Sequence, residues 1–204
     1  MESLRLTAPV ATILLAAMVV ISVAGLSVAP QIVRHCLFRP YWLARQQRSM
    51  AWIGSGFVHA SYGHLFFNAL TFWSFGFALE RTIGSVRFAV LYAAGLLVSD
   101  AGTYFKHRAD PDYASLGASG AILAVLFAAI VYSPRDSLYI MLLPVPVPAP
   151  LFAVLYLAYT IYAARQRQDG INHDAHLGGA ITGLLFVLIT DPGAVAAAWR
   201  SLLG

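Results

Sequence analysis

The sequence predicts an all-α integral membrane protein, a bundle of six transmembrane helices in one domain that covers residues 1–204. Only 11% of the residues are charged and 59% are hydrophobic, whereas soluble domains carry about 25% charged residues. The mean hydropathy is +0.72, and charged residues separate six apolar blocks. The modest net charge of +4, with four arginines within 34–48, indicates contact with anionic lipid headgroups and not with nucleic acid.

Each expected span ends where charge or proline interrupts the apolar pattern. The first is too long to be the apolar region of a signal peptide, which has about 7–15 residues. Glu80-Arg81 stops the second, Lys106-His107-Arg108 the third and Ser133-Pro134-Arg135 the fourth. Pro150 suits the first turn of the fifth, and Asp191-Pro192 closes the sixth. The expected spans are about 8–29, 63–79, 87–105, 117–133, 150–164 and 175–190.

Two connecting segments are not expected to cross the membrane. The first loop, 30–62, contains a glycine-rich part at 52–57 that looks non-helical but carries aromatic residues, which favours a position along the membrane interface. Prolines at alternate positions from Pro144 to Pro150 favour an extended segment. The last three spans are short for a hydrocarbon core of about 30 Å, so their ends are expected to border a sunken polar cavity.

Polar residues of the kind used in serine catalysis begin three of these spans. His64 and Asn68 begin the second span, Ser119 the fourth and His176 the sixth. Successive spans alternate in direction, so the starts of all even-numbered spans lie at the same membrane face. Serine, histidine and asparagine are costly in hydrocarbon and usually face a cavity or a polar partner there. The sequence therefore predicts one polar site at this face.

Helical spacing directs these side chains toward one another. His64 and Asn68 are four residues apart and share a helix face. His176 lies on the face of Gly179 and Gly183, whose spacing lets membrane helices approach closely. Close packing of the fourth and sixth spans would bring Ser119 within hydrogen-bond reach of His176. A serine hydroxyl is a weak nucleophile until such a base takes its proton.

Each signal also has a structural explanation. The run Gly117-Ala118-Ser119-Gly120 is by itself more often a packing motif than a nucleophile, and His176 alone could bond a backbone carbonyl.

His173 and His176 lack a third obvious ligand, so no metal site is predicted. Asp174 is two residues before His176 and points elsewhere on a helix, which favours a Ser–His dyad over a triad. Asp100 in the third span is either a functional acid or a residue at headgroup level.

Together, Gly117-Ala118-Ser119-Gly120, His64-x-x-x-Asn68 and Ala175-His176-x-x-Gly179-x-x-x-Gly183 resemble the motifs of the rhomboid intramembrane serine proteases. The match runs from about His59 to Gly183 and takes in Glu80-Arg81-x-x-Gly84 after the second span. The three motifs occur on the same spans as in that family. The size is similar to the minimal six-span bacterial form, so the resemblance implies a bacterial inner (plasma) membrane protein.

The resemblance implies a role for each matching residue. Ser119 would be the nucleophile and His176 its general base, with no cofactor and no metal. The backbone N–H of Ser119 and the side chains of Asn68 and His64 would stabilise the oxyanion. His59 matches a further family histidine close to the site. Four glycines would support this arrangement: Gly117, Gly120, Gly179 and Gly183.

Two positions depart from the family pattern. Many members carry a Trp-Arg pair in the first loop, whereas Trp52 has no adjacent arginine. Some members place a tyrosine, which stacks on the catalytic histidine, four residues after the nucleophile. That position is Leu123 here, so His176 must be oriented by another residue. Neither change removes a proton-transfer group, and activity is still expected.

The expected activity is that of an intramembrane serine endopeptidase that cleaves single-span membrane proteins near the membrane surface. One alternative is a catalytically silent rhomboid-like protein that binds membrane clients. Another is a small transporter, which the clustering of polar groups at one face disfavours. The orientation stays open, because the resemblance implies a cytoplasmic N-terminus whereas the positive-inside rule favours the reverse. The family orientation puts eight of the thirteen Lys and Arg outside and five inside: Arg5, Arg81, Arg87, Arg135 and Arg200.

Overall fold

The structure, a computed structural model, describes residues 7–46, 50–139, 145–166 and 170–204. Its elements in chain order are α1 (Pro9–Ser27), α2 (Pro30–Cys36), α3 (Pro40–Gln46), α4 (Ala51–Gly54), the 3-10 helix η2 (Ser55–Phe57), α5 (Tyr62–Ile83), α6 (Ser85–His107), α7 (Ser119–Tyr132), β1 (Ser137–Tyr139), β2 (Pro146–Pro148), α8 (Ala149–Gln166), α9 (His173–Thr190) and α10 (Pro192–Leu203). Apart from the antiparallel β1–β2 pair, the fold is all-α, as predicted.

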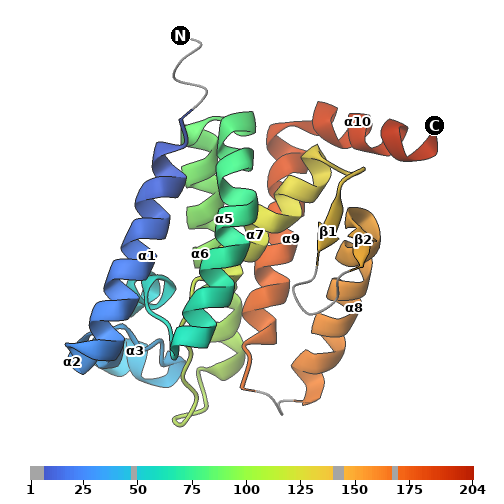
Figure 1. Cartoon of the computed structure of the whole chain (residues 1–204). Coiled ribbons are helices and arrows are strands. Elements are labelled where there is room, and N and C mark those ends of the chain that lie inside the picture. Colours follow the sequence, from blue (N-terminus) through green and yellow to red (C-terminus); the bar gives the residue numbers. More distant parts are fainter. Residues whose placement is uncertain (1–6, 47–49, 140–144, 167–169) are drawn as a thin grey trace.

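The long helices stand side by side in alternating directions, with the short helices α2 and α3 at one end and α10 at the other (Figure 1). Within the described residues, α1, α6 and α9 are long and apolar enough to cross a membrane, and α7 is apolar but shorter. Helices α1 and α5–α9 coincide with the six predicted spans to within a few residues at each end. The architecture is therefore compatible with six crossings, and that count remains a prediction.

Helix α7 forms the centre of the bundle. Almost all of its residues from Gly120 to Ile130 are buried, which explains why it is apolar on every side. Its 14 residues span only about 21 Å at about 1.5 Å per residue. Because this is shorter than a hydrocarbon core of about 30 Å, at least one end of α7 lies below the membrane surface when the bundle is embedded.

Glycines let the neighbouring helices approach the α7 backbone. A Cβ atom added at Gly179 would lie 2.0 Å from the carbonyl oxygen of Gly120, and one added at Gly183 would lie 2.3 Å from that of Ala124. These distances leave no room for any side chain. The predicted close packing of the fourth and sixth spans is thus present, through the two glycines that the sequence singled out. Helix α6 also approaches α7 closely, because a Cβ atom at Gly95 of α6 would lie 2.6 Å from Cβ of Ala124.

Glu80 joins α1 to α5 and α6. Helix α1 begins after Ala8, which has no side chain able to cap it. The Glu80 carboxyl, only 1% exposed, accepts hydrogen bonds from the backbone N–H groups of Val10 (3.1 Å) and Ala11 (2.6 Å) and from Ser85 Oγ (2.6 Å). It thereby satisfies donors that a helix start leaves without intrahelical partners.

The prediction that 52–57 is non-helical is wrong, because this part of the first loop forms α4 and η2. Its glycines permit close packing. A Cβ atom at Gly54 would lie 2.9 Å from Sγ of Cys36, and one at Gly56 would lie 2.6 Å from Leu96 of α6. The Trp52 ring packs on Phe38, with centroids 5.1 Å apart. Tertiary contacts therefore override the low helix propensity of glycine.

The alternating prolines behave largely as predicted. Residues 146–148 are extended and form β2, which pairs with β1, and Pro150 lies in the first turn of α8. Pro144 lies outside the described residues. Proline fixes its backbone angle and lacks an N–H donor, so it suits an edge strand and a first helical turn alike.

Candidate active site

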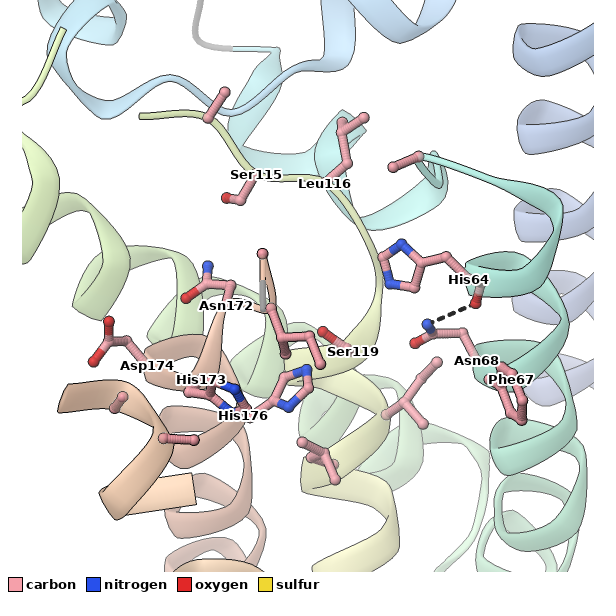
Figure 2. Close-up of a pocket in the computed structure, with 18 of the residues that line it drawn as sticks. His64, Phe67, Asn68, Ser115, Leu116, Ser119, Asn172, His173, Asp174 and His176 are labelled. Carbon is pink, nitrogen blue, oxygen red and sulfur yellow. Dashed lines mark hydrogen bonds between the residues drawn. The ribbon is translucent and has the colours of Figure 1, made fainter. Parts of the chain in front are cut away.

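A cavity of about 1040 Å³ lies where α5, α7 and α9 begin. His64 and Asn68 line it from α5, Ser119 from α7 and His176 from α9. In Figure 2, the Ser119 hydroxyl lies between the His176 ring and the pair formed by His64 and Asn68. The structure therefore brings together, in one cavity, the polar residues that the sequence placed at one membrane face.

Ser119 is the first residue of α7. The first four N–H groups of a helix have no intrahelical partner, and the aligned peptide dipoles favour negative charge at this end. The residue before the helix, Ala118, offers no side-chain cap to these groups. The backbone N–H of Ser119 thus lies in an environment suited to an oxyanion.

Gly117 is required by its backbone conformation and by its neighbour. Its φ of +123° is one that residues with a side chain rarely adopt. A Cβ atom here would lie 2.7 Å from Cε1 of His64, so the chain must pass directly beside the imidazole. Its N–H donates to the carbonyl oxygen of Ser55 at 2.9 Å. Gly117 therefore lets the segment before Ser119 approach His64.

Asn68 is buried, and its side-chain nitrogen Nδ2 donates to the carbonyl oxygen of His64 at 2.9 Å. A carboxamide nitrogen carries two N–H donors, so this bond uses one of them and leaves the other for a group in the cavity. The bond also fixes the rotamer of Asn68 one helical turn from His64, as Figure 2 shows.

His59 lies behind His64 and is fully buried. The two imidazole rings meet edge to face with centroids 4.9 Å apart, and Nδ1 of His59 is 2.9 Å from Oγ of Ser22 in α1. Burial, and secondarily the nearby His64, lowers the pKa of His59 from 6.5 to about 3. A neutral His59 thus supports the ring of His64 and ties the cavity wall to α1.

Asp174 interacts with α6 and not with His176. Its carboxyl oxygens lie 2.7 Å from Nζ of Lys106 and 3.5 Å from Nε2 of His107, and Figure 2 shows the side chain directed away from His176. This geometry agrees with the helical spacing that argued against Asp174 as a third catalytic member.

Tyr156 of α8 contacts His176, and sequence reasoning missed it. Its phenol oxygen lies 2.9 Å from Nδ1 of His176, and the two rings are inclined by 25° with centroids 6.4 Å apart. The only signal in the sequence was indirect. Leu123 in place of the family tyrosine required another residue to orient His176, but nothing in the local pattern indicated which one.

Asp100 is buried within the protein, with 7% of its surface exposed. It accepts a hydrogen bond from Oγ of Ser55 at 3.2 Å. Together with Ser99, Gly120 and Asn172 it borders a space of about 10 Å³ behind Ser119, about one water molecule in size. The carboxyl group thus joins the first loop to α6 beneath the cavity.

In the described part of the chain, no three His, Cys, Asp or Glu side chains gather in a way that could hold a metal ion. His173 and His176 have ring centroids 5.8 Å apart and meet edge to face. The polar groups that line the cavity include the Ser119 hydroxyl, imidazoles and the Asn68 amide.

The fold and the cavity define an all-α membrane protein with a serine-containing polar site at one end of its bundle. The family model described as "Rhomboid domain" matches residues 46–192. Rhomboid protein 1, mitochondrial, of Saccharomyces cerevisiae is 32% identical over 140 residues, covering 66% of this chain and 40% of the relative. The human presenilin-associated rhomboid-like protein, mitochondrial, is 32% identical over 135 residues, covering 65% and 36%. The putative rhomboid protease YdcA of Bacillus subtilis is 40% identical over 68 residues, covering 33% of each chain.

This chain belongs to the rhomboid family, because the family model covers well over half of its length. The matched region includes α5 to α9 and every residue of the cavity named above. The aligned region spans about two fifths of the length of the yeast and human relatives. The resemblance seen in the sequence motifs is thus confirmed at the level of the family.

Proposed function

We propose that this protein is a serine endopeptidase that cleaves membrane proteins, with Ser119 as nucleophile and His176 as general base. The observation that carries the proposal is that Ser119 shares one cavity with His176, His64 and Asn68 in a chain of the rhomboid family. A purely structural role for each residue, as a packing serine or a hydrogen-bonded polar group, does not explain why these residues converge from three helices.

The chemistry would proceed in two steps. His176 takes the proton from Oγ of Ser119 as the oxygen attacks the substrate carbonyl carbon, and then delivers that proton to the departing amine. The C–N bond breaks and an ester forms between Ser119 and the acyl fragment. In the second step His176 takes a proton from water, hydroxide attacks the ester, and the proton returns to Ser119. No metal or cofactor enters either step.

The negative oxygen that forms in each step would be stabilised by three donors. These are the backbone N–H of Ser119 at the start of α7, the second N–H of Asn68, and a ring N–H of His64. Donors already fixed in position before reaction are the largest single source of catalysis in acyl transfer. The hydrogen bond from Asn68 to His64 and the ring contact with His59 support such preorganisation.

The proposed substrates are single-span membrane proteins, cut near the membrane surface. The cavity combines the polar residues named above with the apolar side chains of Phe67, Leu126 and Phe152. This lining suits an apolar substrate segment that has unwound from its transmembrane helix. The proposed surroundings are a lipid bilayer, and the proposed location is the bacterial plasma (inner) membrane. The Bacillus relative supports this location, whereas the yeast and human relatives are described as mitochondrial.

The test is cleavage of a transmembrane fusion substrate by the purified protein in liposomes. The wild type is expected to cleave and the Ser119→Ala variant to be inactive. The matched control is Ser74→Ala, the same change at an exposed position of α5 whose hydroxyl only bonds to its own helix. Cleavage that persists in Ser119→Ala would refute the serine mechanism. Binding of the fusion by both proteins without cleavage would support the client-binding alternative.

A further inference from the structure

A histidine that serves as general base needs a partner that fixes its ring and its tautomer. In serine proteases a carboxylate holds the ring through Nδ1–H, which leaves the lone pair on Nε2 to accept the serine proton. Asp174 cannot do this for His176, because its carboxyl group contacts Lys106 and His107 of α6. Under the proposed function, another residue must therefore orient His176.

Tyr156 contacts Nδ1 of His176 through its phenol oxygen, at 2.9 Å. The two rings are also roughly parallel, so both the distance and the plane of the imidazole are constrained. Tyr156 is itself fixed by aromatic neighbours. Its ring centroid lies 5.5 Å from that of Phe152 on α8 and 5.9 Å from that of Phe127 on α7.

Tyr156 also packs in the same hydrophobic cluster as Leu123. Leu123 is the position, four residues after Ser119, where some relatives carry a tyrosine. A leucine is smaller than a tyrosine and has no polar group, so it cannot hydrogen-bond to the base. The aromatic ring in this cluster instead comes from the neighbouring helix α8.

The direction of the hydrogen bond decides whether His176 can act as a base through Nε2. If the phenol donated to Nδ1, the ring proton would reside on Nε2, and that nitrogen could not accept a proton from Ser119. If Nδ1–H donates to the phenol oxygen, the lone pair resides on Nε2. The phenol proton then needs an acceptor of its own.

Thr160 is placed to be that acceptor. It lies four residues after Tyr156, so both side chains share one face of α8. The Thr160 hydroxyl is fully buried and accepts or donates no hydrogen bond within the described residues. A buried hydroxyl without a partner is unfavourable, so donation from Tyr156 to Thr160 would stabilise the same arrangement that leaves Nε2 able to accept.

We propose that Tyr156 is the positioning residue of His176: its phenol oxygen accepts from Nδ1–H and thereby fixes the catalytically competent tautomer. The role normally held by a carboxylate is thus held by a neutral phenol. It is also supplied by α8, which has only three buried residues among those described. Displacement of α8 would therefore release the base, so that activity depends on the docking of this peripheral helix.

The test compares Tyr156→Phe with Tyr162→Phe in the full chain in liposomes. Phenylalanine keeps the ring contacts of Tyr156 and removes only its hydroxyl. Tyr162 lies on the same helix, is exposed, and provides the same chemical change away from the cavity. We expect kcat for a transmembrane substrate to fall roughly tenfold in Tyr156→Phe, the size of one neutral hydrogen bond. KM and the melting temperature are expected to stay unchanged, and Tyr162→Phe to match the wild type.

A second readout reports the tautomer directly. In protein labelled with ¹⁵N-histidine, NMR distinguishes protonated from unprotonated ring nitrogens, and the His176 signals are those lost in His176→Asn. At a pH where the ring is neutral, we expect protonated Nδ1 in the wild type and a mixture of tautomers in Tyr156→Phe. An unchanged tautomer in Tyr156→Phe would overturn the proposal even if kcat fell, because the role of Tyr156 would then be structural.

The two proposals fail in different ways. If the wild type cleaves no faster than Ser119→Ala, the proposed function fails, while the tautomer measurement still decides the role of Tyr156. If the wild type cleaves and Ser119→Ala does not, but Tyr156→Phe retains the wild-type kcat, the proteolytic function stands and the positioning role is refuted.

Discussion

The contact between Gly179 of α9 and Gly120 of α7 offers a sensitive test of the proposed site. A Cβ atom added at Gly179 would lie 2.0 Å from the carbonyl oxygen of Gly120 and 2.7 Å from its carbonyl carbon. Backbone atoms cannot rotate out of the way as a flexible side chain can. The substitution Gly179→Ala, the smallest possible change that adds a side chain, must therefore move one helix relative to the other.

The required displacement follows from the geometry. Ordinary contact begins at 3.4 Å, so the distance between the added Cβ atom and the carbonyl oxygen of Gly120 must increase by about 1.4 Å. Overpacking of this kind costs about 1–3 kcal/mol of stability. Gly120 adjoins Ser119, and Gly179 lies three residues after His176, so the displacement falls directly between the proposed nucleophile and base. A misplacement of about 1 Å can cost about 100-fold in rate, and a loss of at least that size is expected.

Gly102 of α6 provides the matched control, because a Cβ atom there would meet no other atom within 4 Å. Gly102→Ala should be neutral or more stable by up to about 1 kcal/mol, since alanine favours a helix more than glycine does. The assays are thermal unfolding in detergent and labelling by a serine-directed phosphonate probe. If Gly179→Ala retained the melting temperature and labelling rate of Gly102→Ala, the helices would not pack as the structure shows, and the reasoning would be refuted.

Four further predictions concern individual groups. Asn68→Ala should fold normally but cleave about 10²–10³-fold more slowly, as expected for one lost oxyanion donor; wild-type turnover would remove Asn68 from the mechanism. Burial lowers the pKa of His59 from 6.5 to about 3, so between these values the unfolded chain binds a proton that the folded protein does not. The free energy of unfolding of the wild type should therefore fall as pH falls. In His59→Asn it should fall less steeply, with a slope against pH that is smaller by up to about 1.4 kcal/mol per pH unit. Equal slopes for the two proteins, measured by denaturant titrations at several pH values, would contradict this. Glu80→Ala should lower stability by about 1–3 kcal/mol, because it leaves buried donors of α1 without an acceptor, and an unchanged unfolding midpoint would exclude that role. A reporter active only outside the cytoplasm should give signal when fused after Arg108 if the family orientation holds, and when fused after Arg135 if the positive-inside rule holds.

The ends of the helices could be predicted from sequence because local composition sets them. Glu80-Arg81 and Ser133-Pro134 interrupt apolar runs, and α5 and α7 end close to these residues. The alternation of spans then places Ser119 and His176 at one end of the bundle without any knowledge of packing. The contact through Gly179 was predictable for a similar reason, since glycines at this spacing let helix backbones approach closely.

The glycine-rich segment of the first loop was interpreted incorrectly because glycine has two uses. In an isolated chain Gly54 and Gly56 disfavour a helix by about 1 kcal/mol each. In the folded protein the same glycines allow α4 and η2 to lie against Cys36 and Leu96. The sequence shows the entropic cost of glycine in a helix. It does not show the close packing that offsets this cost, because the residues packed against these glycines lie far away along the chain.

The missed contact of Tyr156 shows where sequence reasoning ended within the site itself. The depth of a residue in a membrane depends on the transfer energy of its own segment, which the sequence contains. The direction in which it points depends on how far its helix is rotated against its neighbours, and that is a property of the packed bundle. For α7 and α9 the glycines fix this rotation and could be identified in advance. Helix α8 has no such pair of glycines, and its rotation depends on how Phe152 and Tyr156 fit beside Phe127. The leucine at position 123 therefore showed that another residue must orient His176. Only the packed structure identified that residue as Tyr156.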